Sequence, residues 1–598
     1  MHNNNCLGLW KTLGNIICKN KDKHSNINQI KLDNKIVNDP MKITTAFNNY
    51  FCNIGKDLAS KFDNITDNDH SKFMKEKQNQ SMYMHKTNSN EIINLINKLD
   101  TKKASGHDEF SAKFLKLCKP YISEQLSEIF NHSITNGVFP DLLKIARVTP
   151  IFKKGDKHEI SNYRPISVLS LINKLFEKII HKRLYKYLTK FNIIYQYQFG
   201  FREGHSTVQA LTEITDRIKN AIDNKMLTCG IMIDLTKAFD TVNHNILLKK
   251  LYNYGLRGNV YKLFKSYLTN RKQYVKIKNE NSDLKSISCG VPQGSVLGPL
   301  LFIIYINDLA YNCKEGIFRI FADDTGIFCH SHDLNSLIVK AKIVLKHIME
   351  WFKLNKLTLN ISKTCFIIFR SNRYNSINIP DSITYDNITI FRESQAKYLG
   401  LILDEHLNWN AHITDLCNKL KRLFPTFYNI RSYLNEDHIK TLYYSMIHSR
   451  INYSCIVYGL TSNENLNKLQ ILQNKLLKVI LKKPYMYPTN ALHNELSILQ
   501  VKDIINQGIL TFVHKYLHSE LPDVFNDYFQ HRHDINDILA GERNLRFLIP
   551  PHRTEIGANT MKVKGPKLYN NIINKIKINT STKVFRKNVK NTFLPYAN

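Results

Sequence analysis

Hydrophobic residues recur at helical spacing in several long segments of the chain. Between Asn90 and Leu99 the apolar positions fall on one face, and Asn88 or Asn90 stands where a helix cap belongs. The same periodicity predicts further helices over Phe110–Asn136, Ser170–Lys190 and Thr207–Asn224. The first half of the chain is therefore expected to carry several amphipathic helices.

Strands are predicted where the apolar residues run together or alternate. Ile145–Phe152 is such a run, and a basic turn of Lys153–Lys157 follows it. Another apolar run, Gly230–Ile233, ends in Asp234 and then changes to a helix-compatible pattern. Ile317–Phe328 has apolar residues on both sides of an Asp-Asp pair, which indicates a β-hairpin with acids at its tip.

Beyond residue 405 the pattern becomes helical. We expect helices in Asn410–Leu434, Asn435–Tyr458 and Leu466–Leu481, and a basic C-terminal segment after them. Elements of both types along one chain predict an α+β fold, with α-helical extensions at the N- and C-terminal ends.

Length and charge narrow the classes of function. At 598 residues the chain is too long for one compact core, and 43% hydrophobic residues suit a folded protein. The formal net charge of +34 favours a polyanionic partner such as nucleic acid. A compositional bias towards Asn, Ile and Lys is the alternative explanation of that charge.

The cysteine spacing and the first residues of the sequence indicate where in the cell the protein is expected. The chain has 11 cysteines, none at C-x-x-C spacing, so a zinc knuckle is not expected. No secretory pattern opens the sequence, and the apolar run Leu300–Ile306 is far short of a membrane span. We therefore expect an intracellular protein, in cytoplasm and nucleus, without a membrane partner.

Three aspartates are the strongest candidates for chemistry. Asp234 follows a buried strand, where a carboxylate is useful mainly if it binds a cation, although such a residue is usually a cap or turn. Asp323 and Asp324 are adjacent on a turn and repel each other unless a cation lies between them, although an Asp-Asp turn alone is usually structural. Mg²⁺, a hard ion that takes carboxylates and substrate phosphates, suits this set.

The order of short motifs resembles the reverse transcriptases of non-LTR retrotransposons, most closely the Jockey-like lineage. Individually the motifs are weakly specific, but they occur together in the family's order. They are Arg147–Asp156, Asn162–Ser167, Gln198–Thr207, Asp234–Asp240, Gly290–Pro299, Phe321–Asp324, Leu357–Thr364 and Lys397–Gly400.

The resemblance implies a two-metal polymerase site. Asp234, Asp323 and Asp324 would be catalytic, and with the backbone of Leu235 they would hold two Mg²⁺ ions, or Mn²⁺. It also assigns nucleotide binding to Lys153, Lys154, Arg164, Phe239, Gln293, Gly294 and Lys363, and a primer grip to Tyr398 and Gly400.

Several of these assignments have a plainer alternative. Lys153 and Lys154 also suit a solvated basic turn, and Phe239 a core position rather than an obstacle to a ribose 2′-hydroxyl. Pro292–Gly294 alone would be an ordinary turn, and Lys363 a surface lysine rather than a proton donor to pyrophosphate. Asp240 is expected to be structural.

The fold implied by the resemblance is a right-hand polymerase. It has an N-terminal extension (1–100), fingers and a palm with an antiparallel sheet (101–405), a helical thumb (406–485) and a basic C-terminal helical region (486–598). The expected reaction is RNA-directed DNA synthesis on a primer 3′-hydroxyl, with an RNA template, a DNA primer or target and dNTPs as partners.

Two other interpretations remain open from sequence. One is an intron maturase-like protein, and the other is a catalytically silent nucleic-acid-binding relic, against which the three intact aspartates argue. Full-length elements of the family carry an upstream endonuclease whose residues are not visible before residue 100. We therefore expect the endonuclease domain to be absent from this chain.

Overall fold

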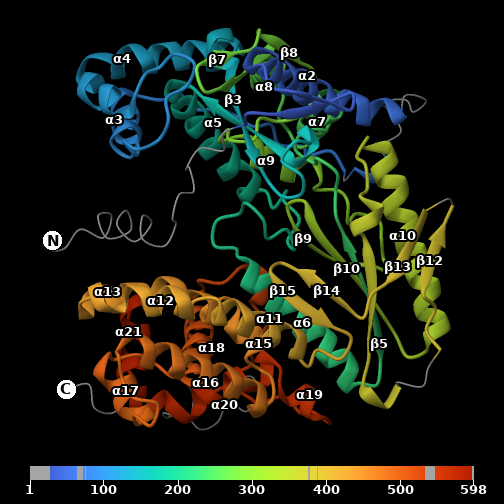
Figure 1. Cartoon of the computed structure of the whole chain (residues 1–598). Helices are drawn as coiled ribbons and strands as arrows, with labels where there is room; N and C mark the ends of the chain where they lie inside the picture. Colours follow the sequence, from blue (N-terminus) through green and yellow to red (C-terminus); the bar gives the residue numbers. More distant parts are fainter. Residues whose placement is uncertain are drawn as a thin grey trace.

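A computed structural model describes residues 27–62, 72–74, 76–374, 378–386, 388–531 and 546–594 (Figure 1). The predicted N-terminal extension therefore lies partly outside the described residues. The part that is described contains a small hairpin, β1 (Ile30–Leu32) and β2 (Lys35–Val37), and the helix α2 (Pro40–Ala59).

The central feature is a six-stranded sheet whose two faces bury different side chains. Along β5 (Leu227–Ile233), Ile231 belongs to the same buried cluster as the helix α10 (Leu334–Leu354), whereas Met232 belongs to the cluster around α6 (Thr207–Asp223). This alternation is the period of two expected of a strand buried on both sides. The strand order is β12 (Ser382–Tyr385), β13 (Ile388–Arg392), β11 (Cys365–Phe369), β5, β10 (Asp324–Ser331) and β9 (Ile317–Phe321).

A second sheet lies in the upper part of the molecule as drawn (Figure 1). Its strands are β4 (Tyr163–Leu169), β3 (Ile145–Phe152), β6 (Arg271–Ile277), β7 (Glu280–Asn281) and β8 (Lys285–Ile287). Helices surround it: α3 (Ser89–Asn97), α4 (Ala112–Asn136), α5 (Leu171–Lys190), α7 (His244–Asn253), α8 (Gly258–Leu268) and α9 (Gly298–Tyr305).

The lower part contains one hairpin and many helices (Figure 1). The hairpin is β14 (Gln395–Tyr398) and β15 (Leu401–Asp404). The helices are α11 (Asn410–Lys421), α12 (Phe424–Ile430), α13 (Glu436–Leu442), the π-helix η8 (Tyr443–His448), α14 (Ser449–Asn452), α15 (Cys455–Tyr458), α16 (Asn463–Ile480), α17 (Thr489–Glu495), α18 (Val501–Leu517), α19 (Glu555–Ala558), α20 (Met561–Ile572) and α21 (Thr582–Phe593).

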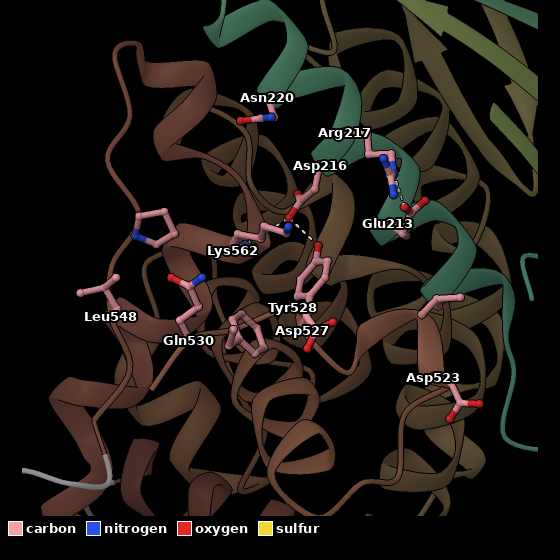
Figure 2. A pocket seen from close by; sticks show the side chains of 13 residues that line it. Glu213, Asp216, Arg217, Asn220, Asp523, Asp527, Tyr528, Gln530, Leu548 and Lys562 are labelled. Atoms are coloured by element: carbon pink, nitrogen blue, oxygen red, sulfur yellow. Dashed lines mark hydrogen bonds and ion pairs between the residues drawn. The ribbon is translucent and has the colours of Figure 1, made fainter. Parts of the chain in front are cut away.

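Buried carboxylates on α6 hold the C-terminal region against the six-stranded sheet. Asp216 accepts hydrogen bonds from the Tyr528 hydroxyl at 2.6 Å and from the Met561 and Lys562 amides at 3.0 and 3.1 Å (Figure 2). Asp223 accepts from the amide of Thr554 at 2.7 Å. Because these acceptors are buried and satisfied, the C-terminal helices are an integral part of the fold.

Most predicted elements are confirmed, with changed ends. β3 and α5 match their predicted ranges closely, and Asn88 is the cap of α3, accepting from the Glu91 amide at 2.9 Å. The two helices expected over 410–434 and 435–458 are confirmed as helical regions, but each is divided into shorter helices, one of them the π-helix η8. Among the described residues, no helix is both long and apolar enough to span a bilayer.

Candidate active site

Strand register brings the three aspartates to one end of the six-stranded sheet. β5 and β10 are antiparallel with Ile233 paired to Thr325, so continuing the ladder by one residue places Asp234 opposite Asp324. Asp323 occupies the turn between β9 and β10, where Phe321 pairs with Asp324. The acidic hairpin tip predicted from sequence is confirmed.

The turn that carries the acids is held from behind by the segment before α6. Ala322 has a left-handed backbone (φ 55°), which is uncommon for a residue with a side chain. The Gln198 side-chain oxygen accepts from the Ala322 amide at 3.1 Å and from the Gly200 amide at 2.9 Å. A Cβ on Gly200 would lie 2.5 Å from the Ala322 nitrogen, so only glycine allows this approach.

The charged forms of the two acids in the turn are destabilised by burial and by the neighbouring carboxylates. Their side chains reach solvent but are ringed by protein, and this desolvation raises the pKa of Asp324 to about 6, helped by the charges of Asp323 and Asp234. Desolvation, followed by Asp234, also raises the pKa of Asp323. A divalent cation would relieve this repulsion, so the carboxylate set fits Mg²⁺ chemically.

Lys363 bonds directly to the first aspartate. Its Nζ donates to Asp234 Oδ2 at 2.9 Å, and both side chains are partly exposed. The backbone around them is also linked, because the Asn360 amide donates to the Asp234 carbonyl at 2.9 Å. In the described part of the chain, no three His, Cys, Asp or Glu side chains stand as a preformed metal cluster, and Lys363 occupies one oxygen of Asp234.

Basic residues from the β3–β4 hairpin approach the acids. Burial lowers the pKa of Lys153, and the charges of Arg164 and Lys363 lower it further, while Asp234 opposes them. Lys153 and Arg164 therefore lie within electrostatic range of the acids, and their role in nucleotide binding stays a prediction. Lys154 is exposed in the following turn.

Lys237 is a neighbouring cation that sequence reasoning missed. Its Nζ donates to the carbonyls of Ser161 and Tyr163 at 3.2 Å, which ties the segment after β5 to the β3–β4 hairpin. Its left-handed backbone (φ 49°) allows this reach, and no local pattern signals it.

The predicted Gly290–Pro299 loop closes the site on its other side. Gln293 donates its amide to both oxygens of Asp240, at 2.9 and 3.0 Å, and burial raises the pKa of Asp240 to about 6. Gly294 has φ 125°, and a Cβ there would lie 2.5 Å from the Ser167 carbonyl oxygen. Asp240 is thus a structural partner of Gln293.

Phe239 is partly buried beside this loop. Its ring stacks on Phe302 with centroids 4.5 Å apart and meets Phe201 edge to face at 6.2 Å. Leu235 lies on the same segment and bridges to Leu359. Phe239 therefore has a fixed position on the segment that follows Asp234, and one face of its ring packs against Phe302 of the core.

The candidate primer-grip residues lie in the β14–β15 hairpin. Tyr398 is 4% exposed, and its hydroxyl donates to the Arg319 carbonyl at 3.0 Å, so its side chain supports β9 from within the core. Gly400 occupies the turn with φ 85°, against the ring of Tyr453. Only the turn itself, and not the Tyr398 ring, faces outward.

Comparison with known proteins agrees with this geometry. Residues 151–403 match the family described as reverse transcriptase (RNA-dependent DNA polymerase). The chain is 31% identical over 431 residues to the probable RNA-directed DNA polymerase from transposon BS of Drosophila melanogaster, covering 70% of this chain and 47% of that protein. It is 29% identical over 428 residues to the RNA-directed DNA polymerase from mobile element jockey of the same species, covering 69% and 46%. The chain thus spans about half the length of the curated relatives it matches.

Proposed function

We propose that this protein is an RNA-directed DNA polymerase, because residues 151–403 match the reverse transcriptase family and the chain is similar to the polymerases of transposon BS and mobile element jockey. It would add deoxynucleotides to a primer 3′-hydroxyl along an RNA template. The single observation that carries the proposal is the β5–β10 register, which supports a common site for Asp234, Asp323 and Asp324.

The carboxylates would hold two Mg²⁺ ions together with the Leu235 carbonyl. Bound there, the ions would activate the primer hydroxyl and stabilise the leaving pyrophosphate. The protein's own part is to hold the acids rigidly, which Gln198 and Gly200 do through the Ala322 turn. On this proposal the six-stranded sheet is the palm, within fingers and palm over 101–405, and the thumb covers 406–485, followed by the basic region 486–598.

The cations beside the acids suit the incoming triphosphate. Arg164 and Lys153 would contact phosphate oxygens, with Lys154 at the edge. Lys363 would move from Asp234 to the pyrophosphate and donate a proton to it. The Gln293 and Gly294 loop would lie against the nucleotide and the turn at Gly400, backed by Tyr398, against the primer.

Primer extension on an RNA template tests the proposal. With Mg²⁺ and dNTPs the protein is expected to extend an annealed DNA primer, and a chelator should stop the reaction. An RNA template bound tightly without any metal-dependent extension would refute the polymerase assignment and favour a silent nucleic-acid-binding protein.

Substitution of Phe239 tests sugar selection. Replacing it with valine removes the ring that would obstruct a ribose 2′-hydroxyl, so discrimination against rNTPs should fall by on the order of tenfold to 100-fold. The measurement is the ratio of kcat/KM for dNTP and rNTP. The Phe239→Tyr variant, which keeps the ring, should retain discrimination, and equal ratios in all three proteins would contradict the role.

The raised pKa of Asp324, about 6, predicts a pH dependence of Mg²⁺ binding. A raised carboxylate pKa means that the charged form is disfavoured in the fold, so its stability contribution is present at low pH and lost as pH rises through about 6. Mg²⁺ needs the charged form, so its affinity should fall about tenfold per pH unit below pH 6. Titration calorimetry measures this, and Asp324→Asn should remove the step near pH 6.

A further inference from the structure

A basic cavity lies in the C-terminal part of the molecule, between η8, α18 and α21. Its volume is about 590 Å³, within the range of ligand-binding pockets. It is lined by Tyr444, His448, Leu499, Gln507, Thr511, Lys515, Thr582, Lys583, Arg586, Lys587 and Lys590. Five of these side chains are cationic, none is a carboxylate, and none is assigned to the polymerase site above.

The cations are arranged by the helical repeat of α21. Lys583, Arg586, Lys587 and Lys590 follow one another at steps of three, one and three residues, which places them within one face about 100° wide. The apolar residues Phe585 and Val589 are buried on another side of the helix. The cationic face is therefore held in one orientation by its own buried residues.

Contacts to neighbouring elements fix α21 in place. The Phe585 ring stacks on His514 of α18 with centroids 4.1 Å apart. Gln507, also on α18, donates to the Arg586 carbonyl at 2.9 Å. Because the backbone of Arg586 is held, its guanidinium projects from a rigid scaffold rather than from a loose tail.

These cations lack the partners that usually neutralise a basic helix. Within the described residues, Lys515, Lys583, Arg586 and Lys587 form no ion pair with any carboxylate. Lys590 donates to the Tyr444 hydroxyl at 3.0 Å. Burial, followed by the charges of Arg586 and Lys590, lowers the pKa of His448 to about 4, so His448 is neutral and the positive charge of the wall comes from its five lysine and arginine side chains.

One of the lining side chains is an exposed aromatic ring, that of Tyr444. Tyr444 is 39% exposed and lies on the π-helix η8, a rare distortion that is frequent at functional sites. Its ring meets His448 edge to face at 5.1 Å. Unpaired cations beside an exposed aromatic ring are the combination that binds single-stranded nucleic acid, where phosphates meet cations and a base stacks on the ring.

We propose that this cavity is a second nucleic-acid site, which binds the phosphodiester backbone of a single strand. Lys583 and Lys590 lie about 10 Å apart along the helix axis, so the four cations of α21 can meet more than one phosphate of the same strand. Tyr444 receives one base. The site does not depend on catalysis, because Asp234, Asp323 and Asp324 lie on the six-stranded sheet and not on the elements that form the cavity.

Fluorescence anisotropy with labelled 12-nucleotide RNA and DNA single strands tests the proposal. The full chain carrying Asp323→Asn is used throughout, so failure of polymerase activity cannot imitate failure of binding. Adding Arg586→Ala and Lys587→Ala should weaken binding and flatten the dependence of log K on log salt by about 1.4, the value for two lost phosphate contacts. Adding Tyr444→Leu should weaken binding about 5- to 100-fold and leave the salt slope unchanged.

Lys577→Ala is the matched control, because Lys577 is exposed in the same region but does not line the cavity. It should change the affinity for neither strand. The proposal is overturned if Lys577→Ala weakens binding as much as Arg586→Ala and Lys587→Ala, or if Tyr444→Leu has no effect. It is also overturned if a duplex binds as tightly as the single strands. A 4-thiouridine RNA should cross-link to η8 or α21, and cross-linking only elsewhere would refute the location.

Discussion

The Asp323→Asn variant is expected to lose primer extension by at least about 10³-fold, because removing a metal-binding charge forfeits several kcal/mol of transition-state stabilisation. The same change should not unfold the protein. Desolvation raises the pKa of Asp323, so its charge is a cost to the fold at neutral pH, and a neutral amide removes that cost. The two measurements are single-turnover extension and the midpoint of chemical denaturation.

Asp381→Asn provides the matched control. Asp381 is also an aspartate at the start of a strand, but its side chain is 92% exposed and its partner Arg392 lies 3.4 Å away. Its replacement should leave both extension and stability unchanged. Extension by the Asp323→Asn protein at the unchanged rate would remove Asp323 from the site, whatever the fate of the other two acids.

Local patterns were enough to locate these aspartates in the fold. A short apolar run followed by an acid, and a hairpin with two acids at its tip, are features of short segments. β5 and the β9–β10 hairpin therefore appeared in the sequence before the structure was known. The order of the motifs indicated that these two segments carry one site, and the pairing of β5 with β10 places them side by side in one sheet.

The contacts that hold the site residues in place could not be predicted from local patterns. Gln198 holds the Ala322 amide across 124 residues of sequence, and nothing in either segment indicates the partner. Tyr398 was predicted from its motif to help hold a primer end, and the bond from its hydroxyl to a carbonyl of β9 was not foreseen. The two helices predicted over 410–434 and 435–458 are each divided into shorter ones, because apolar periodicity continues across the junctions between them. Such contacts depend on tertiary packing, which a one-dimensional pattern does not contain.

A buried ion pair directly behind the acidic hairpin is the largest of these unpredicted features. Arg319 on β9 and Glu213 on α6 form a two-pronged pair, with Nη2 of the arginine 2.5 Å from Oε1 and a second, shorter bond through Nε. Arg319 is 1% exposed and Glu213 is 5% exposed. Burial alone would raise the pKa of Glu213, but Arg319, followed by Arg217, outweighs burial and holds it below the ordinary value.

Breaking this pair is expected to destabilise the whole fold and not only the site. Arg319→Met leaves Glu213 as a poorly compensated buried charge, so the free energy of unfolding should fall by about 3–5 kcal/mol. Arg217→Met is the matched control, because Arg217 bonds the same carboxylate but is 46% exposed, and such pairs contribute about 0–1 kcal/mol. Urea denaturation of both variants measures the difference. Equally large losses would mean that both arginines are needed to compensate Glu213; a loss confined to Arg319→Met would identify this pair as the link through which α6 holds the acidic hairpin in place.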